Sequence, residues 1–225
     1  MTCKNCDPKY NYPGRMIKVA SPDWECPICA YCGDKIFDER KIIDMAESIR
    51  YASQSRWDEY FLRLCETVSN KSPCLSRTIG VVLTRHNSVV ATGYNGPARG
   101  VPHCGHERLK VDESLQKAIN SKVIDRRELD ITCPRQLMNY KTGKGLEWCL
   151  ASHAEQNVIA NAAMLGVNVY DTTLYMNCVL PCKNCMSLLI NAGISEIVVT
   201  SLNPYDDYSK YILNHSSIKV REFDI

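Results

Sequence analysis

The sequence lacks several features that would assign it to a particular class of protein. No apolar run approaches the roughly 18 residues that a membrane span needs, and no apolar stretch follows the opening MTCKNCDPKY. The 27 Lys and Arg nearly balance the 25 Asp and Glu, which leaves a net charge of +2. Internal repeats and low-complexity segments are also missing. We therefore expect a cytoplasmic protein without a membrane partner, and the charge alone gives no reason to expect nucleic-acid binding.

Cysteine, in contrast, is abundant, with 13 residues in a chain of 225. An odd number leaves one thiol over in any closed disulfide framework, and the cytoplasm is a reducing compartment. Cysteines in such proteins are more often metal ligands or small core residues. Several of them stand in C-x-x-C pairs, and this spacing indicates zinc.

The first ~35 residues hold five of these cysteines and show no sustained helical or strand period. Two C-x-x-C pairs about 20 residues apart are typical of a zinc ribbon. Gly33 permits the tight turn that follows the second pair. The expected ligands are Cys3, Cys6, Cys29 and Cys32, with Cys26 as the alternative partner of Cys29. Such a module would serve as a structural cap on an oligomer or as a contact for nucleic acid or another partner.

Hydrophobic periodicity predicts an α/β fold. Residues 36–53 and 56–69 read as two helices, with a domain boundary near Ser53. Residues 1–53 would then form the zinc-ribbon-like segment and linking helix, and residues 54–225 the main domain. Residues 104–150 are polar and are expected to form a long irregular insertion. The other expected elements are strands at 79–83, 89–93, 172–178, 197–200 and 218–223, and helices at 154–165, 182–192 and 205–214. This order implies a mixed five-stranded sheet covered by helices.

Two motifs at the starts of successive predicted helices suggest a catalytic zinc site. His153-Ala154-Glu155 and Pro181-Cys182-x-x-Cys185 match H-x-E…P-C-x-x-C, the signature of zinc-dependent nucleobase deaminases. A catalytic zinc takes three protein ligands, here His153, Cys182 and Cys185, and leaves a fourth position for water. A helix N-terminus favours the thiolate form of cysteine. Glu155 is too close in sequence to His153 to share its direction, so we expect it to face the water as general acid and base.

From Trp57 onward the chain resembles the deoxycytidylate deaminase family. The segments that carry the resemblance are WDEYF, CLSRTIGVVL, ATGYNGPARGVPHC, HAEQNVIANAA, PCKNCMSLLINAGISEIVV and NPYDDY. The resemblance implies a cytidine-deaminase-like three-layer α/β/α fold and zinc-dependent hydrolysis of dCMP to dUMP and ammonia, which supplies dUMP for thymidylate synthesis. It also implies a homo-oligomer, often a hexamer, that dCTP activates and dTTP inhibits together with Mg²⁺.

The same resemblance points to four substrate-binding residues. An amide at Asn95 can both donate to and accept from a sugar hydroxyl, and Gly93 and Gly96 would let the backbone turn tightly around it. A guanidinium can hold a phosphate with two parallel hydrogen bonds. A plain Asn-Gly turn, solvated arginines and a packing tyrosine are the ordinary structural alternatives. The four positions are Asn95, Arg77, Arg99 and Tyr205.

A second, structural zinc site is also implied by the resemblance. Its candidate ligands are Cys74, His103, Cys104 and Cys149. Relatives often carry a histidine where this chain has Glu147-Trp148, so Cys133 and His106 are alternatives for the fourth ligand. Such a site would pin the 104–150 insertion to the core.

Three other functions stay open on sequence grounds. The substrate could be dCTP, or cytosine within a nucleic acid, for which a basic and aromatic groove is expected. The near-neutral charge disfavours the nucleic acid. A non-catalytic, zinc-binding regulatory subunit is the third possibility, but it would have no use for Glu155.

Overall fold

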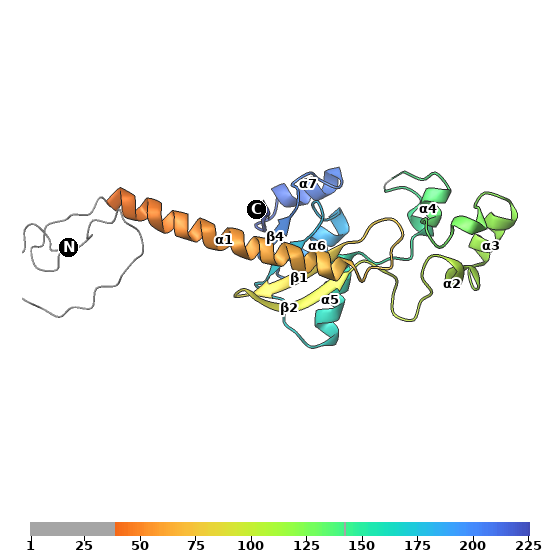
Figure 1. Ribbon diagram of the computed structural model, residues 1–225, viewed down its shortest axis with the longest axis horizontal. Helices are drawn as coiled ribbons and strands as arrows, with labels where there is room; N and C mark the ends of the chain where they lie inside the picture. Colours follow the sequence, from red (N-terminus) through yellow and green to blue (C-terminus); the bar gives the residue numbers. More distant parts are fainter. Residues whose placement is uncertain (1–38, 142) are drawn as a thin grey trace, which may run out of the picture. The chain divides into compact units, whose positions relative to one another are not determined.

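The computed structural model describes residues 39–141 and 143–225 (Figure 1). Within this part of the chain the main elements follow the predicted order of helices and strands. They are α1 (Glu39–Ser69), β1 (Gly80–Arg85), β2 (Ser88–Tyr94), α5 (Ala154–Met164), β3 (Thr173–Met176), α6 (Lys183–Asn191), β4 (Glu196–Val199), α7 (Asp207–Asn214) and β5 (Lys219–Glu222). The zinc-ribbon ligands predicted from the sequence, Cys3, Cys6, Cys29, Cys32 and the alternative Cys26, lie outside the described residues.

The five strands form one mixed sheet in the order β2-β1-β3-β4-β5. β1 runs antiparallel to both β2 and β3, whereas β3, β4 and β5 are parallel to one another. His86 and Asn87 join β1 to β2 with φ angles of 49° and 58°, the left-handed conformations that a tight hairpin requires. The mixed five-stranded sheet predicted from the sequence is therefore confirmed.

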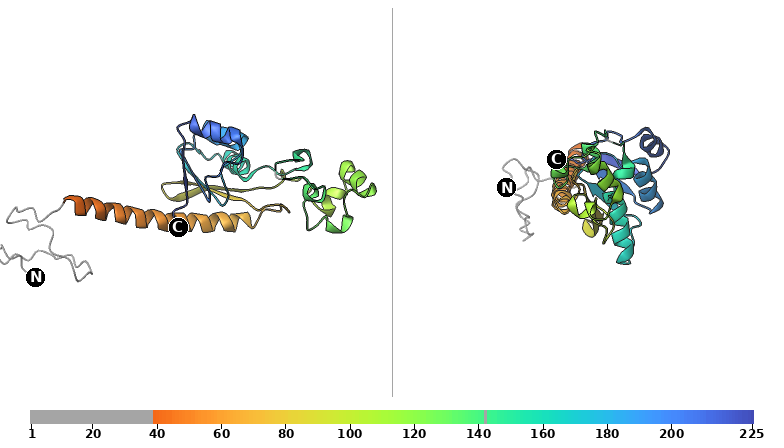
Figure 2. Two further views of the ribbon diagram at one scale, coloured as in Figure 1. Left: turned by 90° about the horizontal axis from the view of Figure 1, so that it is seen from above. Right: turned by 90° about the vertical axis from the view of Figure 1, so that its right-hand side faces the viewer.

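Successive side chains of each strand point to opposite faces of the sheet, and both faces are covered. Val81, Leu174 and Ile197 pack on one face beneath α5, α6 and α7. Their neighbours Val82, Tyr175 and Val198 pack on the other face against α1 residues Phe61 and Cys65. Figure 2 shows α7 and residues 55–69 of α1 on opposite sides of the strands. The result is the expected three-layer α/β/α arrangement.

Two glycines allow helices to approach the sheet closely. A Cβ at Gly93 of β2 would lie 2.5 Å from the backbone nitrogen of Val158 in α5. A Cβ at Gly80 of β1 would lie 2.0 Å from the carbonyl oxygen of Cys65 in α1. Neither Gly93 nor Gly96 has a positive φ angle. We expected Gly93 and Gly96 to allow a tight turn around Asn95. In the structure Gly93 has a different role, which is to let α5 pack closely against β2.

The sequence predicts two separate helices at 36–53 and 56–69, but the described residues from Glu39 to Ser69 form one continuous helix, α1. The residues between them, Ser53-Gln54-Ser55, include neither Pro nor Gly, so the helical hydrogen bonds continue. Residues Ser55–Ile225 form one compact unit that contains the whole sheet. The division of the chain into domains 1–53 and 54–225 stays a prediction.

The 104–150 insertion is more ordered than its sequence suggested. Its short helices surround a small core of Leu115, Ala118, Ile124 and Leu129. Asp112 caps the longest of these helices by accepting a hydrogen bond from the backbone of Leu115 at 3.0 Å. Helices this short show too few turns for periodicity to reveal them. They are α2 (His106–Leu109), α3 (Glu113–Asn120), η1 (Arg126–Glu128), α4 (Pro134–Leu137) and η2 (Leu146–Trp148).

No helix among the described residues is both long enough and apolar enough to cross a bilayer.

A buried carboxylate ties α1 to the edge strand β5. Asp58 is 0 % exposed and accepts hydrogen bonds from Nη1 and Nη2 of Arg221, the latter at 3.0 Å. The backbone N–H of Asp224 donates to the same carboxylate at 2.9 Å. Burial by itself lowers the pKa of Arg221, but Asp58 and Glu196 together raise it. This network therefore holds the helix layer against the sheet on the α1 face.

Removing the Asp58 carboxylate leaves the Arg221 charge without its main partner. We expect Asp58→Ala to lower the free energy of unfolding by about 2–4 kcal/mol, less than for a fully buried pair because Arg221 retains 29 % exposure. Glu59→Ala on the same helix breaks only the exposed pair with Arg63, so it should change stability by at most about 0.5 kcal/mol. Urea denaturation followed by circular dichroism measures both. Equal effects of the two variants would contradict the assignment.

Candidate active site

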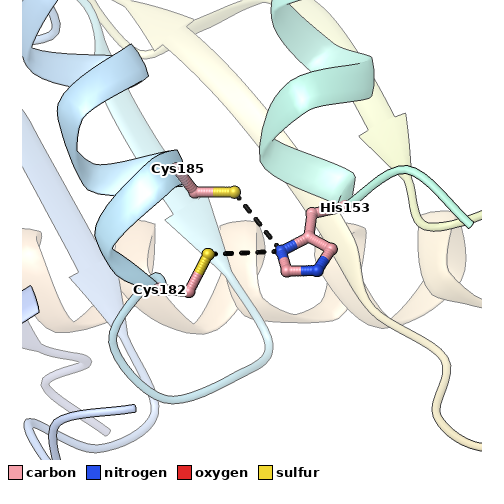
Figure 3. Close-up of side chains that lie close together, drawn as sticks. All are labelled: His153, Cys182 and Cys185. Carbon is pink, nitrogen blue, oxygen red and sulfur yellow. Dashed lines mark hydrogen bonds between the residues drawn. The ribbon is translucent and has the colours of Figure 1, made fainter. Parts of the chain in front are cut away.

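Two helices, α5 and α6, begin next to each other and bring three metal-binding side chains together. His153 is the N-cap of α5, Cys182 is the N-cap of α6, and Cys185 lies in the first turn of α6. All three side chains point toward one another (Figure 3). Nδ1 of His153 lies 3.5 Å from Sγ of Cys182 and 3.4 Å from Sγ of Cys185.

The three ligand atoms fit a tetrahedral zinc ion. With Zn–S near 2.3 Å and Zn–N near 2.0–2.1 Å, tetrahedral geometry requires a nitrogen–sulfur separation of about 3.6 Å. The observed separations of 3.5 and 3.4 Å match this value. In the described part of the chain, no other group of three or more His, Cys, Asp or Glu has its ligand atoms within 4.8 Å of one another.

Local hydrogen bonds set the position at which each helix starts. Ser152 and Gly96 exchange backbone hydrogen bonds of 2.8 and 3.1 Å, which deliver the chain to His153. The side chain of Gln156 then accepts from the backbone N–H of His153 at 2.9 Å. At α6, the backbone N–H of Lys183 donates to Asp206 at 3.0 Å. The ligands therefore lie on anchored backbone rather than on free loops.

The protonation of the three side chains is coupled. The Cys182 thiol has its pKa lowered to about 4, first because Cys185 donates a hydrogen bond to its sulfur and also because His153 lies beside it. The same bond and burial raise the pKa of Cys185. The hydrogen bond with Cys182 raises the pKa of His153. A thiolate beside an imidazolium is thus favoured, and a metal cation bound by these three side chains would take the place of the shared protons.

Glu155 lies in the first turn of α5, two residues after His153, and is 4 % exposed. Burial raises the pKa of its carboxyl group. The side chain lines the same pocket as His153 and Cys182. A carboxyl group in this position can hold and release a proton next to a molecule bound in the pocket.

Three of the four predicted substrate-binding residues line this pocket: Asn95, Arg77 and Tyr205. Oδ1 of Asn95 accepts hydrogen bonds from Ser72 Oγ and from the backbone of Ile79, each at 2.8 Å. Its Nδ2 donates to the carbonyl of Arg77 at 2.8 Å. Asn95 thus also holds the loop between α1 and β1. The Arg77 guanidinium lies over the Tyr205 ring, 5.8 Å from its centroid.

The fourth predicted residue, Arg99, is not among those that line the pocket. Its guanidinium donates to Oδ1 of Asn161 at 2.9 Å and contacts the sulfur of Met164, both on α5. The sequence predicted that Arg99 binds substrate, but its side chain contacts Asn161 and Met164 on α5 instead.

The residues expected to form the second zinc site also gather around the pocket. Cys74, His103, Cys104 and Cys149 line it, and so does the alternative Cys133. No three of them have ligand atoms within 4.8 Å of one another. The other alternative, His106, pairs instead with the Asp130 carboxylate.

Sequence reasoning missed one charged residue of the pocket, Arg135. It lies on α4, within the insertion that reads as solvated surface. No motif marks it, because only the folding of the insertion brings it to the pocket.

The α/β/α fold and the His153-Cys182-Cys185 group are typical of a zinc-binding protein. A family model described as the cytidine and deoxycytidylate deaminase zinc-binding region matches residues 55–201, which include all four motif residues. The chain belongs to this zinc-binding deaminase family.

Curated relatives point in the same direction. The chain is 29 % identical over 191 residues to a deoxycytidylate deaminase of Saccharomyces cerevisiae, covering 84 % of this chain and 52 % of the relative. It is 29 % identical over 167 residues to that of Schizosaccharomyces pombe, covering 74 % and 44 %. The chain thus spans about half the length of these two relatives. A deoxycytidylate deaminase of Mycobacterium phage D29 is 27 % identical over 154 residues and is covered over 95 % of its length.

Among solved structures, the chain is similar to the dCMP deaminase of cyanophage S-TIM5 in complex with dCMP and dUMP. The TM-score is 0.50 at 19 % identity, and the match covers 73 % of this chain and 94 % of the other. This similarity supports the cytidine-deaminase-like fold.

Proposed function

We propose that this chain hydrolyses dCMP to dUMP and ammonia, and so supplies dUMP for thymidylate synthesis. The observation that carries the proposal is the placement of His153, Cys182, Cys185 and Glu155 around one pocket. Relatives named deoxycytidylate deaminase support the choice of dCMP over other cytosine compounds.

In this proposal His153, Cys182 and Cys185 hold the catalytic zinc. When bound, zinc supplies the Lewis acidity that makes water a nucleophile near neutral pH. The surrounding chain contributes two further features to this metal site. The two helix N-termini stabilise the thiolates, and the buried position of Cys185 keeps bulk water from one side of the centre.

Glu155 is the proposed proton carrier. Hydrolysis at C4 of cytosine forms a C–O bond and breaks the bond to the amino group. One proton of the attacking water must move to N3, where it stays in the uracil product, and the second must move from the new C4 hydroxyl to the amino group, which leaves as ammonia. The burial that raises the Glu155 pKa makes its carboxylate a better proton acceptor than an exposed glutamate. One side chain can thus serve both transfers.

Asn95 and Tyr205 are proposed to position the nucleotide. Nδ2 of Asn95 carries a second hydrogen besides the one bonded to Arg77, and this hydrogen can be donated to a sugar hydroxyl. The Tyr205 ring offers a flat surface beside the base. Arg77, over that ring, is placed to meet the phosphate.

Substituting Glu155 separates catalysis from metal binding. We expect Glu155→Gln to lower kcat on dCMP by about 10²–10⁴, because the amide keeps the size but cannot accept a proton. Zinc content and nucleotide binding should persist. The exposed Glu147→Gln serves as the matched control and should retain activity. Near-normal turnover of Glu155→Gln would sink the mechanism. Parallel assays with dCTP, cytidine and single-stranded DNA test the substrate.

Two structural zinc sites are proposed beside the catalytic one. One involves Cys74, His103, Cys104 and Cys149, with Cys133 and His106 as the alternatives for the fourth ligand. All of these except His106 line the pocket, and this common position supports the site. The other would be formed by Cys3, Cys6, Cys29 and Cys32, with Cys26 as the alternative partner of Cys29.

Elemental analysis tests these metal assignments together. We expect about three zinc ions per chain, each with three or four protein ligands. His153→Ala should lose about one zinc ion along with the activity, whereas Cys74→Ser should lose a different one. A wild-type content of one ion would remove both structural sites and leave the catalytic assignment standing, whereas a content near zero would remove all three.

We also propose that the protein acts in the cytoplasm as a homo-oligomer, for which the family resemblance implies a hexamer. In this state dCTP activates it, and dTTP with Mg²⁺ inhibits it, by shifting the equilibrium between two conformations.

Regulation can be measured on the dCMP saturation curve. Millimolar dTTP with Mg²⁺ should raise the substrate concentration at half-saturation, and dCTP should reverse the shift, since each ligand favours a different conformation. Analytical ultracentrifugation shows the oligomer under the same conditions. A curve unmoved by either nucleotide would refute the regulatory part of the proposal and leave the activity intact.

A further inference from the structure

A second cavity opens beside the active-site pocket. Its volume is about 170 Å³, and its lining includes Gln136 and Tyr140 of the insertion. Four residues line both cavities, so the two spaces adjoin. The shared residues are Ser76, Arg77, Cys133 and Arg135.

The charges that line the two cavities are unevenly distributed. Arg77 and Arg135 are the arginines among the described lining residues, and both belong to the shared boundary. Glu155 is the only carboxylate among these lining residues, and it lines the active-site pocket but not the second cavity. A molecule with a neutral end beside Glu155 and an anionic end in the second cavity would therefore match the electrostatics of the whole space.

The Arg135 guanidinium is oriented by backbone groups of its own insertion. Its Nε donates to the carbonyl of Lys144 at 2.8 Å, and its Nη2 lies 3.5 Å from the carbonyl of Lys141. Nη1 carries two further N–H donors. Pro134, at the first position of α4, stiffens the backbone next to it. The Arg135 side chain is thus held in place before an anion binds, which lowers the entropy cost of binding.

Arg77, in the loop before β1, lies at the same boundary between the two cavities. Asn95 holds its backbone carbonyl, and the Tyr205 ring lies beneath its guanidinium. The two arginines come from separate segments, the loop before β1 and the insertion. Paired guanidiniums from two segments are suited to a phosphate, which accepts bidentate hydrogen bonds from each.

We propose that Arg77 and Arg135 together bind the 5′-phosphate of the nucleotide, and that Arg135 determines specificity for a nucleotide over a nucleoside. This inference rests on the proposed function for the position of the base. It gives the 104–150 insertion a role in substrate selection, because its fold places Arg135 at the boundary of the two cavities. Arg99, which contacts α5 instead, takes no part.

Binding of the product and its nucleoside tests the inference directly. Isothermal titration calorimetry compares dUMP with deoxyuridine on the zinc-loaded full chain. We expect Arg135→Gln to weaken dUMP binding by about 10- to 100-fold, since charge-assisted bonds to the phosphate are lost, and to weaken deoxyuridine binding far less. Arg135→Lys should fall between, because lysine keeps the charge but loses the bidentate geometry. The exposed Arg126→Gln of the same insertion is the matched control and should leave both affinities unchanged.

Two outcomes would overturn the inference. Equal weakening of dUMP and deoxyuridine by Arg135→Gln indicates a merely structural role, which circular dichroism and the melting temperature of the variant would also reveal. Unchanged binding of both excludes the contact altogether. Because the readout is binding, it stands apart from the proposed deaminase activity: a wild-type protein that binds dUMP through Arg135 but does not deaminate dCMP refutes the activity alone.

Discussion

The contact between α5 and β2 leaves no room for a side chain at Gly93, and the geometry of the site depends on it. A Cβ there would lie 2.5 Å from the Val158 backbone. Two asparagines on α5 complete the contact by donating to strand carbonyls, Asn157 to Tyr94 and Asn161 to Thr92, each at 2.8 Å. These contacts fix the distance of α5 from the sheet and its rotation about its own axis. His153 and Glu155, at the start of the helix, are thereby held at defined positions opposite α6.

The electrostatics of the site follow from that placement. Two helices direct their N-termini at one point, where a thiolate is favoured and where His153, Cys182 and Cys185 would hold a metal cation. Glu155 is buried on the same helix as His153, which raises its pKa, while Asn95 is engaged with the loop before β1. The candidate metal ligands His153 and Cys182, the buried Glu155 and the residues proposed to bind the nucleotide thus line one pocket.

The 104–150 insertion extends this site in a way that its composition conceals. It has its own small core around Leu115 and Leu129. Arg108, 3 % exposed, joins its two ends by donating to the carbonyl of Trp148 and to the Asp112 carboxylate, each at 2.7 Å. A segment braced in this manner can present a side chain as rigidly as a strand does. The specificity proposed for Arg135 depends on this rigidity.

The sequence by itself determined the order of helices and strands, the mixed sheet and the grouping of His153, Cys182, Cys185 and Glu155, because periodicity and motif spacing are local properties. Tertiary structure alone decided the rest. Whether an arginine faces the pocket depends on contacts distant in sequence: Arg99 is held by Asn161 on α5, whereas the folded insertion carries Arg135 to the cavity. The continuity of α1 likewise escaped pattern reading, since polar residues at 53–55 suggest a break that no Pro or Gly enforces.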